Sequence, residues 1–251
     1  MKFTFDKYKT LVEMVYMNGY KVSNYLNWKE NANPCIFRHD VDYDLKKAFQ
    51  FAEMESEIIL GDESLKSTYF VLLSSDFYNL FSKENIRIIK QIRSLGHDVG
   101  LHFDEKKYMD DATFDKEKLV LAVNKEVEIL SELLGEAVAS VSMHRPSKAF
   151  LESDIQFDKI INSYGYPFFQ KFKYLSDSRM HWRENVESIV ENKQYNALHI
   201  LTHPFWYNDI EMEMHDILKQ FIKKYPERIY ESMNDNFRDL ETVLLPEEVS
   251  W

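Results

Sequence analysis

The sequence has little of several features that mark common classes of protein. It contains one cysteine, Cys35, which excludes an internal disulfide and any zinc site built from several cysteines. Because Cys35 lies within an apolar run, we expect it to be a buried core thiol. No stretch rich in proline, glycine or serine and no internal repeat divides the chain. We therefore expect a single domain over residues 1–251, with residues 1–30 as an N-terminal helical extension.

Long apolar segments and clusters of positive charge are also missing. No apolar window reaches the length of a transmembrane helix, and the first residues lack the apolar core of a secretory signal. The formal net charge is -11 and Lys and Arg are dispersed, which argues against nucleic acid and anionic membranes as main partners. We expect a cytoplasmic protein with a small-molecule or glycan substrate and no membrane insertion.

What the sequence does contain is an alternation of strand-like and helix-like segments. Short apolar runs rich in strand-forming residues cover residues 34–40, 67–73, 97–102, 137–143, 173–177 and 197–202. Apolar residues at helical spacing mark residues 6–18, 45–60, 83–95, 119–134 and 209–224. This alternation predicts parallel strands joined by right-handed crossovers, and no glycine-rich nucleotide fingerprint follows any strand. The fold class expected is α/β, a deformed or incomplete (β/α) barrel with outer helices.

The expected strands end in residue types that bind metals or transfer protons. Asp40 and Asp42 are separated by one residue, so on an extended backbone both carboxylates point to the same side. The other strand ends supply His102, His144, Arg145, Asp177 and His203. In a parallel barrel such ends converge on one rim, and a carboxylate with two imidazoles is a common ligand set for zinc. We expect Asp42, His102, His144 and His203 to act jointly.

The remaining histidines are expected to be structural. His39 alternates away from Asp40 and Asp42 along the same strand, and His97 opens a strand instead of closing it. No catalytic role is expected for the last three histidines, which are His181, His199 and His215.

Over residues 34–207, several short motifs in order resemble the NodB-homology polysaccharide deacetylases. Residues 37–42, Phe-Arg-His-Asp-Val-Asp, resemble the first motif of that family, which is usually Thr-Phe-Asp-Asp-Gly, in a variant with one residue between the aspartates. The further motifs are similar to residues 96–102, 143–147, 176–182 and 201–204. No single motif is specific, but their shared order is a strong signal.

The resemblance implies metal-assisted hydrolysis of an N-acyl group, most often acetyl, on an amino sugar or a related carbohydrate precursor. By the order of the family, Asp40 is the base and Asp42 a metal ligand, although the reverse assignment stays open. His102 corresponds to the first ligand histidine and His203 to the catalytic histidine. The metal expected is Zn²⁺.

One departure from the family concerns the third ligand. The usual second ligand histidine lies four residues after the first, and Lys106 occupies that place. We therefore expect His144 as the third ligand, with Asp104 as the alternative.

The resemblance also implies supporting roles. Arg145 would orient Asp40 and keep it ionised, and Asp177 would tune His203. The residues expected to form an apolar wall for the substrate are Trp182, Phe205 and Trp206. Two alternatives stay open: a deformylase or cyclic-amide hydrolase on the same barrel, and a catalytically degenerate barrel that binds carbohydrate, which Lys106 motivates.

Overall fold

A computed structural model describes residues 1–109 and 113–249, and the chain divides into two compact units. The first unit, Met1–Asp209, holds every described strand and all the predicted site residues. The second unit, Ile210–Trp251, consists of helix α7 (Met214–Asn234) and two short 3-10 turns, η6 (Leu240–Thr242) and η7 (Pro246–Glu248). The single domain over residues 1–251 stays a prediction, and its last two residues lie outside the described ranges.

The main sheet of the first unit is parallel, and its strands run in the order β8-β7-β6-β5-β2-β10-β9, with β1 paired to the first residues of β2. The strands are β1 (Lys21–Ser23), β2 (Pro34–Val41), β5 (Thr68–Val71), β6 (Asp98–Phe103), β7 (Ser140–Met143), β8 (Ile161–Asn162), β9 (Lys173–Ser176) and β10 (Leu198–Thr202). A separate antiparallel pair consists of β3 (Ile59–Leu60) and β4 (Glu63–Ser64).

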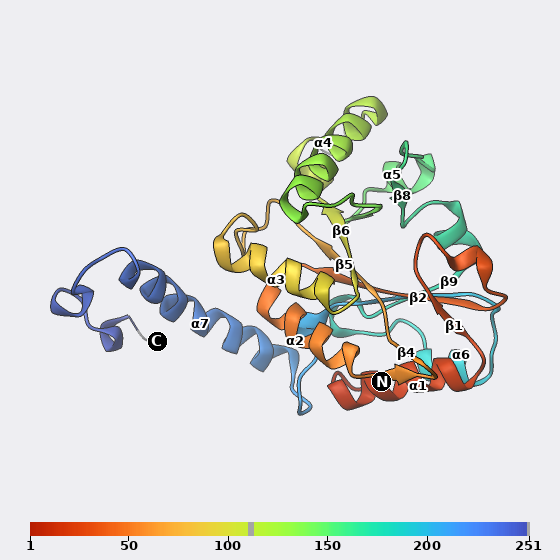
Figure 1. The fold of residues 1–251 in the computed structure, drawn as a ribbon, viewed down its shortest axis with the longest axis horizontal. Coiled ribbons are helices and arrows are strands. Elements are labelled where there is room, and N and C mark those ends of the chain that lie inside the picture. The colour runs from red at the N-terminus through yellow and green to blue at the C-terminus, as the bar shows by residue number, and fades with distance from the viewer. Residues whose placement is uncertain (110–112, 250–251) are drawn as a thin grey trace. The chain divides into compact units, whose positions relative to one another are not determined.

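Helices connect the strands and flank the sheet (Figure 1). They are α1 (Phe5–Met17), α2 (Leu45–Ser56), α3 (Lys83–Ser94), α4 (Lys116–Leu134), α5 (Lys148–Ser153) and α6 (Val186–Glu191). Helix α1 packs against α2 and α6, α2 against α3, and α3 against α4. Within the described ranges, no helix combines the length and apolar character that crossing a bilayer requires.

Two helices differ in extent from the sequence-based expectation. Helix α2 ends at Ser56 and not at residue 60, because Ile59 and Leu60 form strand β3 and pair with β4. Helix α7 begins at Met214 and continues through Pro226 to Asn234, whereas residues 209–224 were expected. It thus includes Pro226, although proline lacks the backbone N–H that a helix interior uses.

A side chain of β2 shows how strongly the sheet curls. Arg38 is fully buried, and its guanidinium donates to Ser142 Oγ on β7 at 2.7 Å. Strands β5 and β6 lie between β2 and β7 in the sheet, so the contact requires the sheet to bend around Arg38. The end strands β8 and β9 are not paired with each other in the described part of the chain. The incomplete (β/α) barrel expected from the sequence is thereby confirmed.

Gly100 on β6 leaves the space that this interior needs. A Cβ at Gly100 would lie 2.4 Å from Cε1 of Phe70, far inside van der Waals contact. The Phe70 ring in turn lies under the guanidinium of Arg38, whose Cζ is 5.4 Å from the ring centroid. Any side chain at Gly100 would therefore push on the residue against which Arg38 packs.

On the outer side of the sheet, Glu55 of α2 joins helices to strands. Its fully buried carboxylate accepts hydrogen bonds from Tyr8 on α1 and from Tyr69 on β5, and it lies 2.9 Å from Nε2 of His39 on β2. Burial alone raises the pKa of Glu55, but His39, with smaller contributions from His97 and Ser67, lowers it to about 2. His39 is thus structural, as the strand alternation predicts.

His199 on β10 belongs to an aromatic cluster that includes Tyr25, Phe168 and Phe172. It is fully buried, with Nδ1 3.1 Å from the Phe168 carbonyl oxygen and Nε2 2.7 Å from the Tyr25 hydroxyl. The carbonyl can only accept, so Nδ1 carries the proton and Nε2 accepts from Tyr25, which is the neutral imidazole. Burial, with Arg38 as a smaller cause, lowers the pKa of His199 to about 3.

This pKa predicts that the free energy of unfolding falls as pH drops from about 6.5 to about 3. Above the unfolded-state pKa near 6.5, His199 is neutral in both states and contributes no pH dependence. Below it, only the unfolded state takes up the proton until the pH reaches the folded-state pKa of about 3, so unfolding becomes more favourable by up to about 1.4 kcal/mol per pH unit.

Urea unfolding at several pH values between 6.5 and 4.5 measures this slope. His199→Gln removes this titration. It should lower the dependence of the free energy of unfolding on pH by about 1.4 kcal/mol per pH unit, the effect of one proton, whatever its effect on stability at pH 7. His215→Gln, at a side chain that is 78% exposed, is the matched control and should leave the slope unchanged. Equal slopes in the wild type and in His199→Gln would contradict the prediction.

Candidate metal centre

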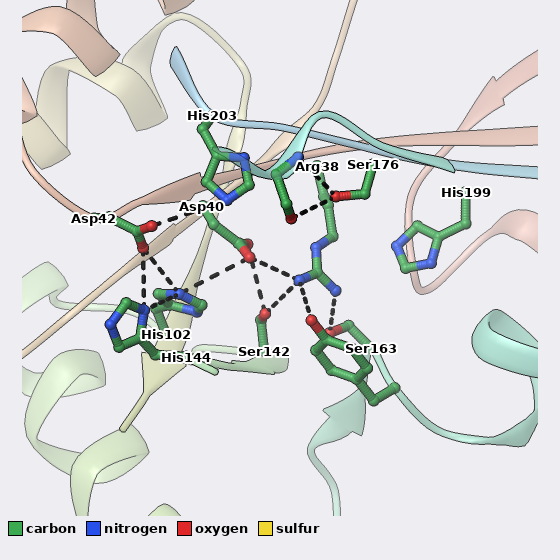
Figure 2. Close-up of polar contacts among 12 residues, drawn as sticks. Arg38, Asp40, Asp42, His102, Ser142, His144, Ser163, Ser176, His199 and His203 are labelled. Carbon is green, nitrogen blue, oxygen red and sulfur yellow. Dashed lines mark hydrogen bonds and ion pairs between the residues drawn. The ribbon is translucent and has the colours of Figure 1, made fainter. Parts of the chain in front are cut away.

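Three of the predicted residues converge at the carboxyl ends of three parallel strands (Figure 2). Asp42 directly follows β2, His102 lies near the end of β6, and His144 directly follows β7. Asp42 Oδ1 is 3.2 Å from His102 Nε2 and 3.2 Å from His144 Nδ1, and the two nitrogens are 3.2 Å apart. In the described part of the chain, this is the group of side chains that could hold a metal ion.

The triangle of donor atoms fits a divalent metal. Ligands ~2.0–2.1 Å from a tetrahedral zinc ion lie roughly 3.3–3.4 Å from one another, close to the spacing found here. Two imidazoles and one carboxylate with a further open coordination position form a donor set typical of catalytic zinc. Asp42 Oδ1 is buried and has no hydrogen-bond partner among the described residues, which suits an oxygen turned toward a cation.

The ionisation of Asp42 also suits metal binding. Burial alone raises its pKa, but the facing imidazoles of His102 and His144, together with His203, hold it well below its usual range. Asp42 is therefore a carboxylate near neutral pH, which is the form that binds a metal.

The structure separates the two alternatives for the third ligand. Asp104 caps the 3-10 turn η2 (Glu105–Lys107), where its Oδ1 accepts from the backbone N–H of Lys106 at 3.1 Å. Its other carboxylate oxygen lies 3.7 Å from Arg145. His144, by contrast, lies within the triangle, so the geometry favours His144 as the third ligand.

Asp40 lies beside the triangle and is held by Arg38, not by Arg145. Arg38 Nη2 is 2.8 Å from Asp40 Oδ2, and both side chains are buried. Arg145 has a side chain that is 66% exposed and lies near Asp104, so the predicted contact of Arg145 with Asp40 is wrong. Sequence reasoning missed Arg38, although a charged residue two places before Asp40 shares its face of the strand.

The surroundings of Arg38 fix the position and charge of Asp40 (Figure 2). Besides Asp40, the guanidinium donates to Ser142 at 2.7 Å, to Ser163 at 2.8 Å and to Tyr164 at 3.3 Å. Burial alone raises the pKa of Asp40, but the Arg38 guanidinium, with smaller contributions from two imidazoles, lowers it. Asp40 Oδ2 lies 3.8 Å from His102 Nε2, so an ionised carboxylate stands next to the candidate metal position.

His203 faces the triangle from the end of β10. Its Nδ1 is 2.6 Å from Asp177 Oδ1, and its backbone N–H donates to Asp177 Oδ2 at 3.1 Å. Nε2 of His203 lies 3.9 Å from Asp42 Oδ2. Burial alone lowers the pKa of His203, but Asp177, with help from Asp42 and Asp40, raises it to about 9. The predicted pairing of Asp177 with His203 is present in the structure.

The triangle residues, Asp40 and His203 line a cavity of about 890 Å³. Of the three residues expected to form an apolar wall, Trp206 lines the cavity, whereas Trp182 and Phe205 are buried and lie outside its described lining. The rest of the apolar lining comes from residues far apart in the sequence, including Tyr43, Leu72, Phe77, Leu151 on α5 and Phe169 in the helical turn Pro167–Lys171. Because these residues belong to several short segments, no single sequence pattern reveals this wall.

No protein-family model and no curated protein matches the sequence. Solved structures with a similar fold include a chitin deacetylase from Colletotrichum lindemuthianum, which is 15% identical, with 76% of this chain and 81% of that chain covered and a TM-score of 0.44. The catalytic domain of a peptidoglycan N-acetylglucosamine deacetylase from Eubacterium rectale is 16% identical, with 75% and 81% covered and a TM-score of 0.44.

A CE4 family pseudoenzyme from Bacillus anthracis is also similar, at 16% identity and a TM-score of 0.41, with 79% of this chain covered. This chain spans only 62% of that pseudoenzyme and 64% of a mutant of it with restored enzymatic activity. Similarity at this level supports no conclusion about function. Function is inferred below from the geometry of the site itself.

Metal binding provides the first test of this centre. The purified protein should bind one divalent ion, and loss of Asp42, His102 or His144 to alanine should weaken the affinity by more than about 100-fold, the upper effect of removing a residue that only supports a ligand. Competition of the apo-protein with a chromogenic zinc chelator measures the affinity. Asp104→Ala is the matched control. A larger loss of metal affinity for Asp104→Ala than for His144→Ala would identify Asp104 as the third ligand in place of His144.

The Arg38–Asp40 pair provides a second test, in stability. Arg38→Met leaves a buried carboxylate without its cation and should lower the free energy of unfolding by about 3–5 kcal/mol, and the double variant Arg38→Met/Asp40→Asn should recover part of that loss. Lys46→Met, which breaks an exposed pair with Glu84, should cost less than about 1 kcal/mol. Urea unfolding at pH 7 measures all three. Similar losses for Arg38→Met and Lys46→Met would refute the importance of the buried pair.

Proposed function

We propose that this protein is a metal-dependent hydrolase that removes an N-acyl group, in the first instance acetyl, from an amino sugar or a related carbohydrate precursor. One observation carries the proposal. A triangle of candidate metal-binding atoms from Asp42, His102 and His144 lies next to a buried carboxylate and to a carboxylate-bound imidazole, on one cavity. A divalent metal bound by these residues supplies Lewis acidity, which polarises a carbonyl group and acidifies water.

Asp40 is the proposed general base. It lies 3.8 Å from the nearest ligand nitrogen of the triangle and is therefore within reach of a water molecule that attacks the acyl carbon. Its pairing with Arg38 holds one carboxylate oxygen in place, and its second oxygen has only a 3.5 Å contact with Ser142. The carboxylate thus has a fixed orientation and an oxygen available for the proton.

His203 is the proposed general acid. Asp177 accepts a hydrogen bond from the Nδ1–H group of His203. This bond fixes the ring, with Nε2 toward Asp42 and the cavity. Nε2 is therefore placed to hand a proton to the departing amine, which would otherwise leave as a poor, negatively charged group. Trp206 lines the same cavity and offers an apolar surface to a sugar face or an acyl methyl group.

The order of the sequence motifs supports the same chemistry. The residues that resemble the NodB-homology motifs include Asp40, Asp42, His102 and His203, and all four line one cavity. Hydrolysis of a stable amide requires a base and an acid near the activated carbonyl group, and Asp40 and His203 lie near the triangle to fill these two roles.

Acetate release from N-acetylated amino sugars by the zinc-loaded protein tests this function. Asp40→Asn and His203→Gln should each lower kcat by about 100- to 10,000-fold, because each removes one proton-transfer group. Both variants should keep their zinc, which separates loss of chemistry from loss of the metal. His215→Gln is the matched control, since this histidine is 78% exposed and does not line the cavity.

Formate release from N-formyl sugars in place of acetate would favour deformylation on the same barrel. Wild-type protein that binds sugars but releases neither acid would favour a carbohydrate-binding barrel without hydrolysis. Variants as active as the wild type would refute the roles proposed for Asp40 and His203.

A further inference from the structure

The cavity holds a second group of charged side chains that the proposed chemistry does not use. Arg145, Arg179 and Arg183 line it, together with His181. The same cavity is lined by four carboxylates, Asp40, Asp42, Asp76 and Asp104, so the three guanidinium groups do not give it a net positive charge. An anionic ligand is therefore favoured only at those guanidinium groups that lack a counter-charge in the protein.

Two of these arginines have no hydrogen-bond or ion-pair partner in the part of the chain that the structure describes. Arg145 lies 3.7 Å from Asp104, which offsets part of its charge. Arg179 and Arg183 have neither an ion pair nor a hydrogen bond with the described residues, although Asp76 and Asp104 line the same cavity. Their guanidinium groups are therefore available to a ligand.

The loop that carries these arginines has a defined conformation. Arg179 (φ 57°, ψ 39°) and Met180 (φ 54°) both occupy the left-handed region, which residues with side chains adopt only where the surroundings impose it. Trp182 anchors the segment because its side chain is buried, and the alternate residues His181 and Arg183 are exposed. The fold thus fixes the places from which the arginines reach the cavity.

We infer that Arg179 and Arg183 form a subsite for an oxyanion, a phosphate or carboxylate group, that the substrate carries beside its acylated sugar. The inference rests on the proposed function for the identity of the acylated sugar. Guanidinium groups bind phosphate and carboxylate oxygens through paired N–H donors. The cavity volume of about 890 Å³ lies toward the upper end of the usual range for small-molecule sites, which leaves room for such a group. The substrate class is an anionic N-acyl amino sugar, not a neutral glycan.

Calorimetric titration of the zinc-loaded protein with three deacylated sugars tests the subsite without turnover. Glucosamine is neutral apart from its amine, glucosamine 1-phosphate adds a phosphate, and muramic acid adds a carboxylate. Glucosamine 1-phosphate should bind at least about tenfold more tightly than glucosamine, and the difference should shrink as salt is raised. If muramic acid binds as tightly as glucosamine 1-phosphate, the subsite also accepts carboxylates. If muramic acid binds as weakly as glucosamine, the subsite is specific for phosphate.

The double variant Arg179→Gln/Arg183→Gln should lose the preference for the phosphate sugar. The matched control, Arg87→Gln/Lys90→Gln, removes the same charge from exposed residues of α3 and should keep the preference. A preference that survives in Arg179→Gln/Arg183→Gln, as it would if the phosphate bound only at the metal, overturns the inference. Equal binding of glucosamine and glucosamine 1-phosphate by the wild type also overturns it.

The outcomes separate the subsite from the proposed function. One outcome is that the preference for the phosphate sugar is lost in Arg179→Gln/Arg183→Gln while the wild type releases no acetate from any N-acetylated sugar. This outcome supports the subsite and refutes the hydrolase. Equal kcat/KM for N-acetylglucosamine and its 1-phosphate, without a binding preference, supports the hydrolase and refutes the subsite.

Discussion

The ion pair between Arg38 and Asp40 constrains both the barrel and the site. A guanidinium group removed from water is stable only where its donors find acceptors and its charge finds a counter-charge. Arg38 meets most of these needs with Asp40 from its own strand, Ser142 from β7 and Ser163 just after β8, and only its Nε has no acceptor among the described residues. These groups come together only when the sheet curls, so the curvature and the placement of Asp40 depend on each other.

Much of the fold and of the site could be predicted because apolar runs mark the strands and their ends. Asp42, His102, His144 and His203 follow from that pattern, and the structure brings them to one cavity. The partner of Asp40 could not be predicted, since spacing tells which face of a strand a residue occupies but not what lies opposite. Strands of two or three residues, such as β1 and β8, are too short for any periodicity to reveal.

Asp40 and Asp42 show how two similar side chains acquire different tasks. Asp40 on β2 and Asp42 just past its end are two residues apart and point to the same side of the sheet. Asp40 nevertheless contacts a guanidinium group, whereas Asp42 contacts two imidazoles. A guanidinium carries a permanent charge and occupies the carboxylate with fixed hydrogen bonds. Imidazole nitrogens can instead share a cation with the carboxylate, and this difference in neighbours distinguishes the proposed base from the proposed ligand.

Strand β2 presents Arg38, Asp40 and, just past its end, Asp42 at every second residue, and it pairs with β1, β5 and β10. A shift of this strand by one residue would turn all three side chains to the outer face and bring His39 inward. A molecule folded in the wrong register would then bury no counter-charge for its arginine and assemble no donor triangle. Correct folding and a competent centre are therefore acquired in the same step, which makes metal affinity a direct report of strand register.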